Sequence, residues 1–313
     1  MQYYFAPMEG LTDSVYRRLH HKHFAGVDRY YMPFFSPTIH RCLTKKEDRE
    51  LPMADSVSFT AVPQIMTKVP EDFLWAAQVC RDRGYDQANL NIGCPSGTVV
   101  AKGKGSGMLR DLDGLDRFFD SIFTHAPLPI SVKTRLGVDD DENFPKLMEI
   151  FNRYPIHELT IHPRVRKDFY KNPLHMACFD YAVSVSKNPL CFNGDLCSLE
   201  DIDAITQKHS NLSGVMLGRG LIADPGMLRG GTKIDALKAF HDELLDTYTE
   251  VFGSQRNAMS RLKENWFYLA HKFDGGEKLF KALRKSTDFA QYQGVVEEIF
   301  ATLPLLPSLQ KPW

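Results

Sequence analysis

The chain has 313 residues, enough for one large hydrophobic core or for one core with a small satellite. Its hydrophobic content of 43% and charged content of 25% are those of an ordinary globular protein. Its formal charge of -1 excludes a general electrostatic attraction to nucleic acid or to a membrane surface, so a polyanion would have to be bound by a local patch.

Strand-like runs alternate with helical patterns over about the first 230 residues. The eight runs are Gln2–Ala6, Asp28–Met32, Phe59–Met66, Gln87–Ile92, Pro129–Lys133, Glu158–His162, Pro189–Phe192 and Gly214–Leu217. Between them, apolar residues recur with the helical period, as in Leu115, Phe118, Phe119, Ile122 and Phe123. The size and the order of the elements predict an (α/β)₈ TIM barrel, and a doubly wound open sheet is the alternative.

The pattern changes after the pair Gly230-Gly231, a plausible hinge. From Thr232 onward no strand signal remains, and four segments favour helix, namely Ile234–Phe252, Asn257–Lys272, Gly276–Ser286 and Phe289–Leu303. We therefore predict a catalytic barrel domain over residues 1–231 and an all-α helical bundle domain over residues 232–313.

Cysteine spacing and hydropathy exclude further classes of protein. The six cysteines show no Cys-x-x-Cys spacing and no paired histidines, which argues against a metal site and a disulfide framework. No charged leader with an apolar region precedes the first strand-like run, and no apolar run approaches membrane-spanning length. We expect a monomeric, cytoplasmic protein with no membrane partner.

Cys94 follows a strand-like run directly and lies between Gly93 and Pro95. Glycine and proline mark the end of a strand, and chemistry in parallel barrels collects at the carboxyl ends of the strands. Cys94 is therefore a candidate reactive group, with a buried packing cysteine as the alternative. The glycine-spaced run of residues 102–107 lacks the context of a nucleotide-binding loop and favours a mobile loop after Cys94.

Polar residues also end most of the other predicted strands. Lys133 and Arg135 share one strand face, and His162 and Arg164 follow the next strand along the chain. Loops after the last two strands of such barrels commonly bind phosphate. The runs Asn193-Gly194-Asp195 and Gly218-Arg219-Gly220 suit that task, because glycine allows close backbone approach and arginine provides positive charge.

Six motifs in this order resemble those of the flavin-dependent tRNA-dihydrouridine synthases. They are Ala6-Pro7-Met8-Glu9-Gly10-x-Thr12-Asp13, Asn91-Ile92-Gly93-Cys94-Pro95, Val132-Lys133-x-Arg135-x-Gly137, His162-x-Arg164-x-Arg166, Asn193-Gly194-Asp195 and Gly218-Arg219-Gly220. In the tail, Arg261-Leu262-Lys263-x-x-Trp266-x-x-Leu269 is similar to the family's tRNA-binding domain. The sequence departs from the family pattern at Asn89, where aspartate is usual, and at Pro163 and Val165.

The resemblance implies an FMN-binding barrel followed by a helical bundle. It implies that FMN is reduced by NADPH or NADH and passes hydride to C6 of a uracil in tRNA, while Cys94 gives a proton to C5. The implied FMN-binding residues are Ala6, Pro7, Met8, Gln64, Lys133, His162, Asn193, Gly194, Asp195, Gly218 and Arg219. The implied substrate-binding residues are Asn91, Arg135, Arg164, Arg166, Arg261 and Lys263.

The tail carries a local concentration of positive charge that fits an RNA partner. Residues Arg256 to Lys285 contain eight basic and three acidic residues. Three other functions stay open at this stage. They are another FMN-dependent barrel reductase, a Schiff-base aldolase with Lys133 as the nucleophile, and a catalytically idle RNA-binding relative. The uridine that is modified and the choice between NADPH and NADH also stay open.

Overall fold

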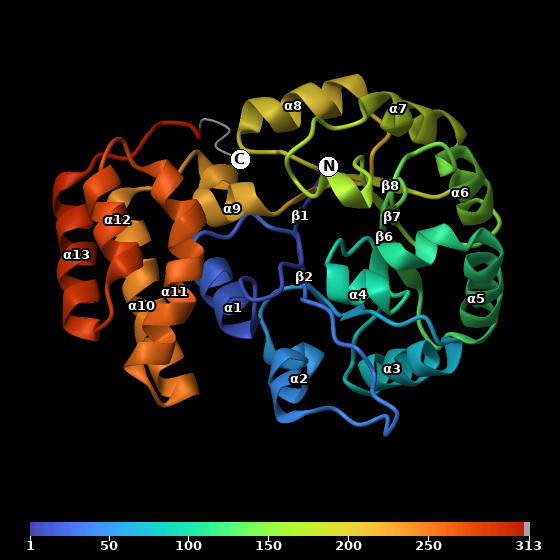
Figure 1. Cartoon of the computed structure of the whole chain (residues 1–313), viewed down its shortest axis with the longest axis horizontal. Helices are drawn as coiled ribbons and strands as arrows, with labels where there is room; N and C mark the ends of the chain where they lie inside the picture. Colours follow the sequence, from blue (N-terminus) through green and yellow to red (C-terminus); the bar gives the residue numbers. More distant parts are fainter. Residues whose placement is uncertain (310–313) are drawn as a thin grey trace.

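The computed structural model describes residues 1–309, so residues 310–313 at the end of the predicted helical domain lie outside it. Within the described part, nine short parallel strands form a nearly closed barrel (Figure 1). The strands are β1 (Gln2–Phe5), β2 (Arg29–Tyr31), β3 (Ala61–Val62), β4 (Gln64–Ile65), β5 (Ala88–Ile92), β6 (Ile130–Arg135), β7 (Leu159–His162), β8 (Leu190–Asn193) and β9 (Gly214–Leu217).

The strand order is β3-β2-β1-β9-β8-β7-β6-β5-β4, so β3 and β4 lie at the two ends of the sheet. These two strands are consecutive in the chain and are separated only by Pro63, which has no N–H to donate to a strand partner. The single strand predicted over Phe59–Met66 is therefore two short strands, and together they close the ring. The prediction of a barrel is confirmed, and the open doubly wound sheet is excluded.

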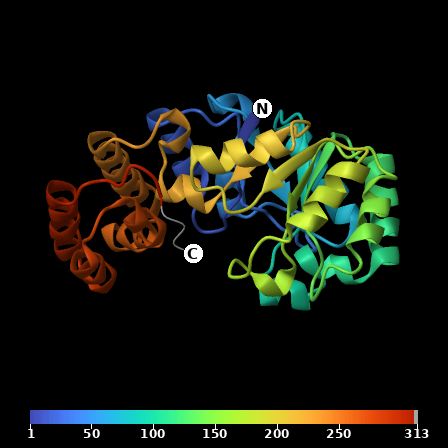
Figure 2. The same ribbon diagram turned by 90° about the horizontal axis from the view of Figure 1, so that it is seen from above.

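Helices cover the outside of the barrel (Figures 1 and 2). They are α1 (Ser14–His23), α2 (Lys45–Glu50), α3 (Pro70–Asp82), α4 (Gly97–Ala101), α5 (Leu112–His125), α6 (Phe144–Phe151), α7 (Met176–Val185), α8 (Leu199–Lys208) and α9 (Arg219–Ala223). Short 3₁₀ turns are η1 (Ala54–Ser56), η2 (Gly105–Arg110), η3 (Arg166–Asp168), η4 (Met227–Arg229) and η5 (Ala270–Lys272).

The helices form where the apolar period and the caps predict them. In α5, Leu115, Phe118, Phe119 and Ile122 are all buried against the barrel. The side chain of Ser198 accepts a hydrogen bond from the Asp201 N–H at the start of α8, as its N-cap position predicts. The strands β5 and β7 are buried along their whole length, although they carry polar residues such as Asn89, Asn91 and Thr160.

The tail consists of α10 (Ile234–Phe252), α11 (Gln255–Leu269), α12 (Glu277–Lys285) and α13 (Phe289–Thr302), close to the four predicted segments. Figure 2 shows this group beside the barrel, with α10 and α11 between the barrel and α13. The ring of Phe240 in α10 packs against Tyr16 and Phe24 of the barrel, at centroid distances of 5.4 and 5.1 Å. The tail is therefore joined to the barrel by a shared apolar core.

Residues 1–309 contain neither a helix that could span a membrane nor a cluster of metal-binding side chains. None of the described helices is both long and apolar enough to cross a membrane. The same residues contain no cluster of three or more His, Cys, Asp and Glu side chains that could hold a metal ion.

Candidate active site

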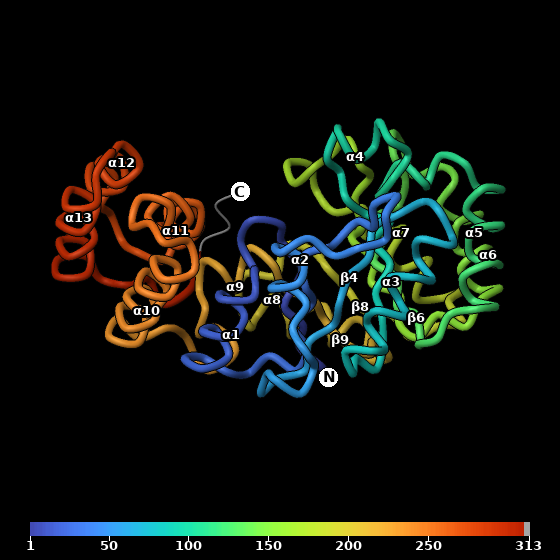
Figure 3. Tube along the Cα trace, turned by 90° about the horizontal axis from the view of Figure 1, so that it is seen from below, coloured from blue at the N-terminus to red at the C-terminus, as the bar shows by residue number. Residues whose placement is uncertain are grey.

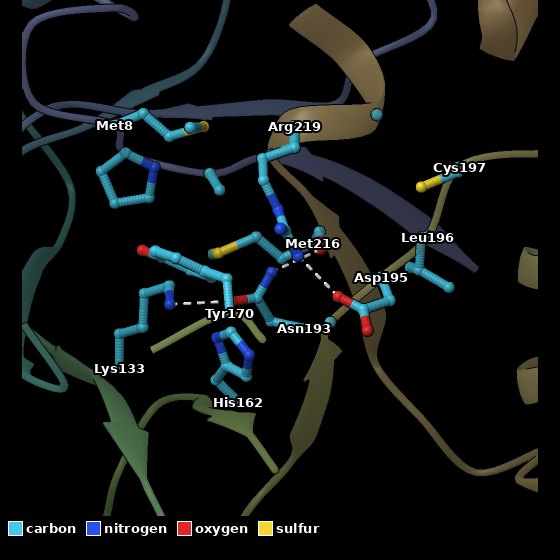
Figure 4. A pocket seen from close by; sticks show the side chains of 15 residues that line it. Met8, Lys133, His162, Tyr170, Asn193, Asp195, Leu196, Cys197, Met216 and Arg219 are labelled. Atoms are coloured by element: carbon cyan, nitrogen blue, oxygen red, sulfur yellow. Dashed lines mark hydrogen bonds and ion pairs between the residues drawn. The ribbon is translucent and has the colours of Figure 1, made fainter. Parts of the chain in front are cut away.

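Two adjoining cavities open at the carboxyl ends of the barrel strands. The first cavity is shown in Figure 4 and is lined by Ala6, Pro7, Met8, Lys133, His162, Tyr170, Asn193, Gly194, Asp195, Leu196, Cys197, Met216, Gly218, Arg219 and Gly220. The second cavity is lined by Pro7, Met8, Glu9, Leu11, Phe34, Asn91, Gly93, Cys94, Pro95, Lys133, Arg135, His162, Tyr170, Arg219 and Tyr268. Because six residues line both, the two cavities form one continuous site.

The first cavity brings together ten of the residues implied to bind FMN, and only Gln64 of that set does not line it. Asp195 accepts hydrogen bonds from two Arg164 nitrogens at 2.9 and 2.5 Å and from Arg219 at 2.6 Å. The Lys133 ammonium lies in the same cavity and donates to Asn193 Oδ1 at 2.8 Å. The cavity wall thus carries the cations Lys133 and Arg219 against the single carboxylate of Asp195, which Arg164 also neutralises from outside the wall. This leaves an excess of positive charge suited to an anionic ligand.

At Gly220, the backbone after β9 packs directly against the backbone of the loop after β8. A methyl group added at this position would lie 2.2 Å from the carbonyl oxygen of Leu196, a distance at which atoms clash. Any larger residue would push α9 away from the loop that carries Asp195. Glycine at position 220 therefore fixes the distance between Asp195 and Arg219.

Burial lowers the pKa values of Lys133 and His162 in the first cavity. Burial, with a further contribution from the Arg135 charge, lowers the pKa of Lys133 from 10.5 to about 8. Burial and the neighbouring cations, Arg135 first among them, hold the pKa of His162 well below its usual range. At neutral pH, His162 is therefore neutral and Lys133 is mostly charged.

Cys94 faces the second cavity from the turn after β5. Asn91 Oδ1 accepts the N–H of Gly93 at 3.1 Å and the N–H of Cys94 at 2.9 Å, which fixes this turn. Burial raises the pKa of the Cys94 thiol, so it keeps its proton at neutral pH. The site therefore contains a protonated thiol beside a cationic cavity.

The segment after Cys94 differs from its prediction. Residues 102–107 were expected to form a mobile loop, but the segment continues from α4 into η2, and Gly105, Ser106 and Gly107 are buried. The Ser106 hydroxyl donates to the carbonyl oxygen of Cys94 at 2.8 Å. A Cβ on Gly105 would lie 3.0 Å from the Cβ of Cys94, so glycine allows this close packing.

A chain of buried amides supports Asn91 from behind. Asn91 Nδ2 donates to Gln64 Oε1 at 2.7 Å, Gln64 Nε2 donates to Asn89 Oδ1 at 2.7 Å, and Asn89 Nδ2 donates to Ser131 Oγ at 2.9 Å. Gln64 is fully buried and lies behind Asn91 rather than in either cavity wall. Asn89, one of the departures from the family pattern, uses both its amide oxygen and its amide nitrogen in this chain of hydrogen bonds.

Of the three predicted substrate arginines in the barrel, only Arg135 lines one of the two cavities described above. Arg135 donates to the carbonyl oxygens of Val165 and Phe169 at 3.0 and 2.9 Å. Arg164 is paired with Asp195, and Arg166 donates to the carbonyl oxygen of Pro95 at 3.1 Å. These arginines hold the loop after β7 and join it to the turn of Cys94.

A family model for dihydrouridine synthases (Dus) matches residues 4–303. The chain belongs to the dihydrouridine synthase family. A probable tRNA-dihydrouridine synthase of Rickettsia bellii is 29% identical over 231 residues, which cover 71% of this chain and 68% of the relative. The tRNA-dihydrouridine synthase B of Pasteurella multocida is 28% identical over 230 residues, which cover 72% of this chain and 67% of the relative.

Solved structures with the same fold are much less similar in sequence. A morphinone reductase mutant in complex with tetrahydroNAD aligns with a TM-score of 0.53 at 10% identity, over 76% of this chain and 90% of that chain. An old yellow enzyme homologue from Zymomonas mobilis aligns with a TM-score of 0.53 at 11% identity, over 73% of this chain and 87% of that chain. At these identities the likeness concerns the barrel fold alone.

In this member of the dihydrouridine synthase family, the tail residues predicted to bind substrate contact the protein itself. Arg261 donates to the carbonyl oxygen of Gly10 and lies 3.8 Å from the Asp13 carboxylate, so it joins α11 to the first loop of the barrel. Lys263 donates to the carbonyl oxygen of Ser286. Their contact with RNA stays a prediction.

Sequence reasoning missed three aromatic residues that line the second cavity, Phe34, Tyr170 and Tyr268. Figure 4 shows Tyr170 extending across the site between Lys133 and Arg219. Its ring lies 4.7 Å from the Arg219 guanidinium and 5.3 Å from that of Arg135. The adjacent pair Phe169-Tyr170 in a polar loop was the available signal, since loop aromatics often serve binding.

Proposed function

We propose that the protein is a tRNA-dihydrouridine synthase, which reduces the C5–C6 double bond of a uridine in tRNA with FMN and with NADPH or NADH. Membership of the family supports this proposal, as do the names of the relatives. The observation that carries it is the single continuous site in which a protonated Cys94 thiol adjoins a cavity with excess positive charge.

The first cavity fits a flavin mononucleotide. Lys133 and Arg219 line it against one carboxylate, Asp195, which is also paired with Arg164, so positive charge remains for a phosphate; Gly218, Arg219 and Gly220 lie at its wall. Lys133 would stabilise negative charge on a bound flavin, because its buried ammonium lies in this cavity and is mostly charged at neutral pH. When bound, FMN would supply the hydride that C6 of the uracil accepts.

Cys94 would supply the proton that C5 accepts. A general acid must carry its proton at the working pH, and burial raises the pKa of this thiol and keeps it protonated. Asn91 holds the turn of Cys94 through two N–H groups, so it positions the acid. It can also offer its amide to the uracil edge, since it lines the same cavity.

A uridine in folded tRNA must leave its stack to enter this site, because the cavity lies at the end of the barrel strands. The tail supports an RNA partner by its charge. Of the eight basic residues from Arg256 to Lys285, five are exposed, namely Arg256, Lys278, Lys281, Arg284 and Lys285. The domain division after residue 231, the monomeric state and the cytoplasmic location stay predictions.

A lowered pKa at Lys133 also suits a Schiff-base enzyme, in which a neutral lysine attacks a carbonyl. That function would leave Cys94 and the cationic first cavity without a role. Borohydride trapping separates the two cases, since only the Schiff-base enzyme would form a covalent adduct at Lys133.

The proposal is tested by two measurements on the purified protein. A yellow cofactor with the mass of FMN should be released on denaturation. With NADPH and uridine-containing tRNA transcripts, nucleoside mass spectrometry should then detect a product two hydrogens heavier than uridine. A protein that holds FMN but leaves every uridine of its cognate tRNA unreduced would contradict the proposed activity.

A further inference from the structure

Two consecutive aromatic residues of α11 lie on two different hollows of the molecule. Tyr268 lines the second cavity together with Cys94. Phe267, which is 59% exposed, lines a groove between α11 and α12, here called the tail groove. The two rings are in edge contact, with centroids 5.0 Å apart and planes at 84°. A ligand that extends from the second cavity past α11 would therefore meet Phe267.

The tail groove combines an aromatic surface with a positive edge. Phe267, Phe273 and Phe280 line it, together with His271 and Arg284. On α12, Lys278, Lys281, Arg284 and Lys285 are exposed, and the only acidic residue of this helix is Glu277. An exposed aromatic ring is common on protein surfaces. Its position in a groove that Arg284 also lines, with three more exposed cations on the same helix α12, is what points to a ligand with flat rings and negative charge.

Figure 3 shows that α12 and α4 lie toward the same edge of the molecule, with α11 between them. The helix α4 directly follows the turn of Cys94. The link between the two hollows is α11, which contributes Phe267 to the tail groove and the adjacent Tyr268 to the second cavity. A chain molecule could thus occupy both hollows at once.

We propose that the tail groove binds an unpaired base of the RNA substrate, stacked on Phe267, close in sequence to the nucleotide whose base enters the second cavity. The phosphates beside the stacked base lie against the exposed cations of α12. This inference rests on the proposed function, because it assumes that the target base in the second cavity belongs to RNA. Stacking on an aromatic ring tolerates any base, so the groove adds affinity rather than sequence recognition.

The test compares Phe267→Ala with Phe267→Trp, which keeps an aromatic surface. Tyr181→Ala is the matched control, because Tyr181 is an exposed aromatic residue on α7, on the outer side of the barrel. Phe267→Ala should raise the KM for tRNA roughly 5- to 100-fold, the usual effect of losing one stacked base. The rate of flavin reduction by NADPH and the melting temperature should stay unchanged. Phe267→Trp should restore the KM, and Tyr181→Ala should leave it at the wild-type value.

A binding assay separates this inference from the proposed function. Oligoadenylate has no uracil, so its fluorescence anisotropy reports the groove without any reduction. Wild-type protein should bind it more tightly than Phe267→Ala does. The double variant Lys278→Ala/Lys281→Ala should make the salt dependence of binding shallower. Lys146→Ala/Lys187→Ala, at two exposed lysines of the barrel outside the tail, is the control and should leave that dependence unchanged. If the protein does not reduce tRNA but these differences in oligoadenylate binding are measured, the proposed function is wrong and the inference that the tail groove binds a base is supported. If Phe267→Ala binds oligoadenylate and tRNA like the wild type, the groove has another partner and the inference is wrong.

Discussion

Cys94 and Lys133 line the same cavity, and burial acts on their pKa values in opposite directions. Burial disfavours the charged form of each group, so the thiol holds its proton more firmly and the ammonium holds it less firmly. At neutral pH the site therefore contains a neutral proton donor, Cys94, and a cation, Lys133, whose pKa is close to the pH of the solution. An anionic ligand in the first cavity would raise the pKa of Lys133 again.

Replacing Lys133 with Met should stabilise the cofactor-free protein at pH 7. Since the folded-state pKa of Lys133 is about 8 and its ordinary value is 10.5, the unfolded chain binds this proton more tightly between those values. The cost of the buried charge is fully present below pH 8 and is lost as the pH rises through 10.5. The stability difference between Lys133→Met and wild type should thus be largest at pH 7 and shrink toward pH 10.5. Urea unfolding at several pH values measures it, and a difference independent of pH would contradict the lowered pKa.

Among the elements, the short helix α9 depends on one glycine for its position. Its position is fixed by the contact between the backbones at Gly220 and Leu196, and this contact places Arg219 beside Asp195. The loops after β8 and β9 therefore act as one unit in the first cavity. Disturbing their contact should affect the ligand before it affects the rest of the barrel.

Gly220→Ala should weaken FMN retention and destabilise the fold, because the added methyl group would lie 2.2 Å from the Leu196 oxygen. Gly294→Ala in α13 is the matched control, since a methyl group there meets nothing within 4 Å. That control should raise stability by about 0.5–1 kcal/mol through the higher helix propensity of alanine. Flavin content per protein and the melting temperature measure both effects. Equal flavin content in the two variants would refute the role of Gly220.

The elements were largely predictable from the sequence, whereas the loops of the site were not. The period of apolar residues located the strands and the tail helices, because that period reflects burial directly. The position of Tyr170 was not predictable, since its loop is held by hydrogen bonds from Arg135, which is distant in sequence. Tyr268 was not predictable either, because it belongs to the tail and reaches the second cavity only through the packing of the tail on the barrel.

At the scale of the whole molecule, a buried ion pair joins the tail to the barrel. Lys272 Nζ lies 2.6 Å from the Asp224 carboxylate, and both side chains are almost fully buried. Asp224 follows α9, and Lys272 ends η5 after α11, so the pair fixes the tail close to the site. The same tail contributes Tyr268 to the second cavity, which makes the site dependent on this docking.

Lys272→Met should reduce the free energy of unfolding by about 3–5 kcal/mol, because it leaves the Asp224 charge buried without its counter-ion. The double variant Lys272→Met/Asp224→Asn should lose less, since no charge then remains. Chemical denaturation of the wild type, the two single variants and the double variant gives the coupling energy between the residues. Equal losses in the single and double variants would show that the pair does not stabilise the docked tail.

The proton-donor role of Cys94 is tested most directly by stopped-flow absorbance of the flavin in Cys94→Ala, with Cys42→Ala, at an exposed free cysteine, as the control. Cys94→Ala should fold, hold FMN and be reduced by NADPH at a near-normal rate, because the thiol is not needed for these steps. When tRNA is added, recovery of the oxidised flavin absorbance should be roughly 10²- to 10⁴-fold slower than in the wild type, the usual contribution of a positioned general acid. Recovery at the wild-type rate would show that Cys94 is not the acid.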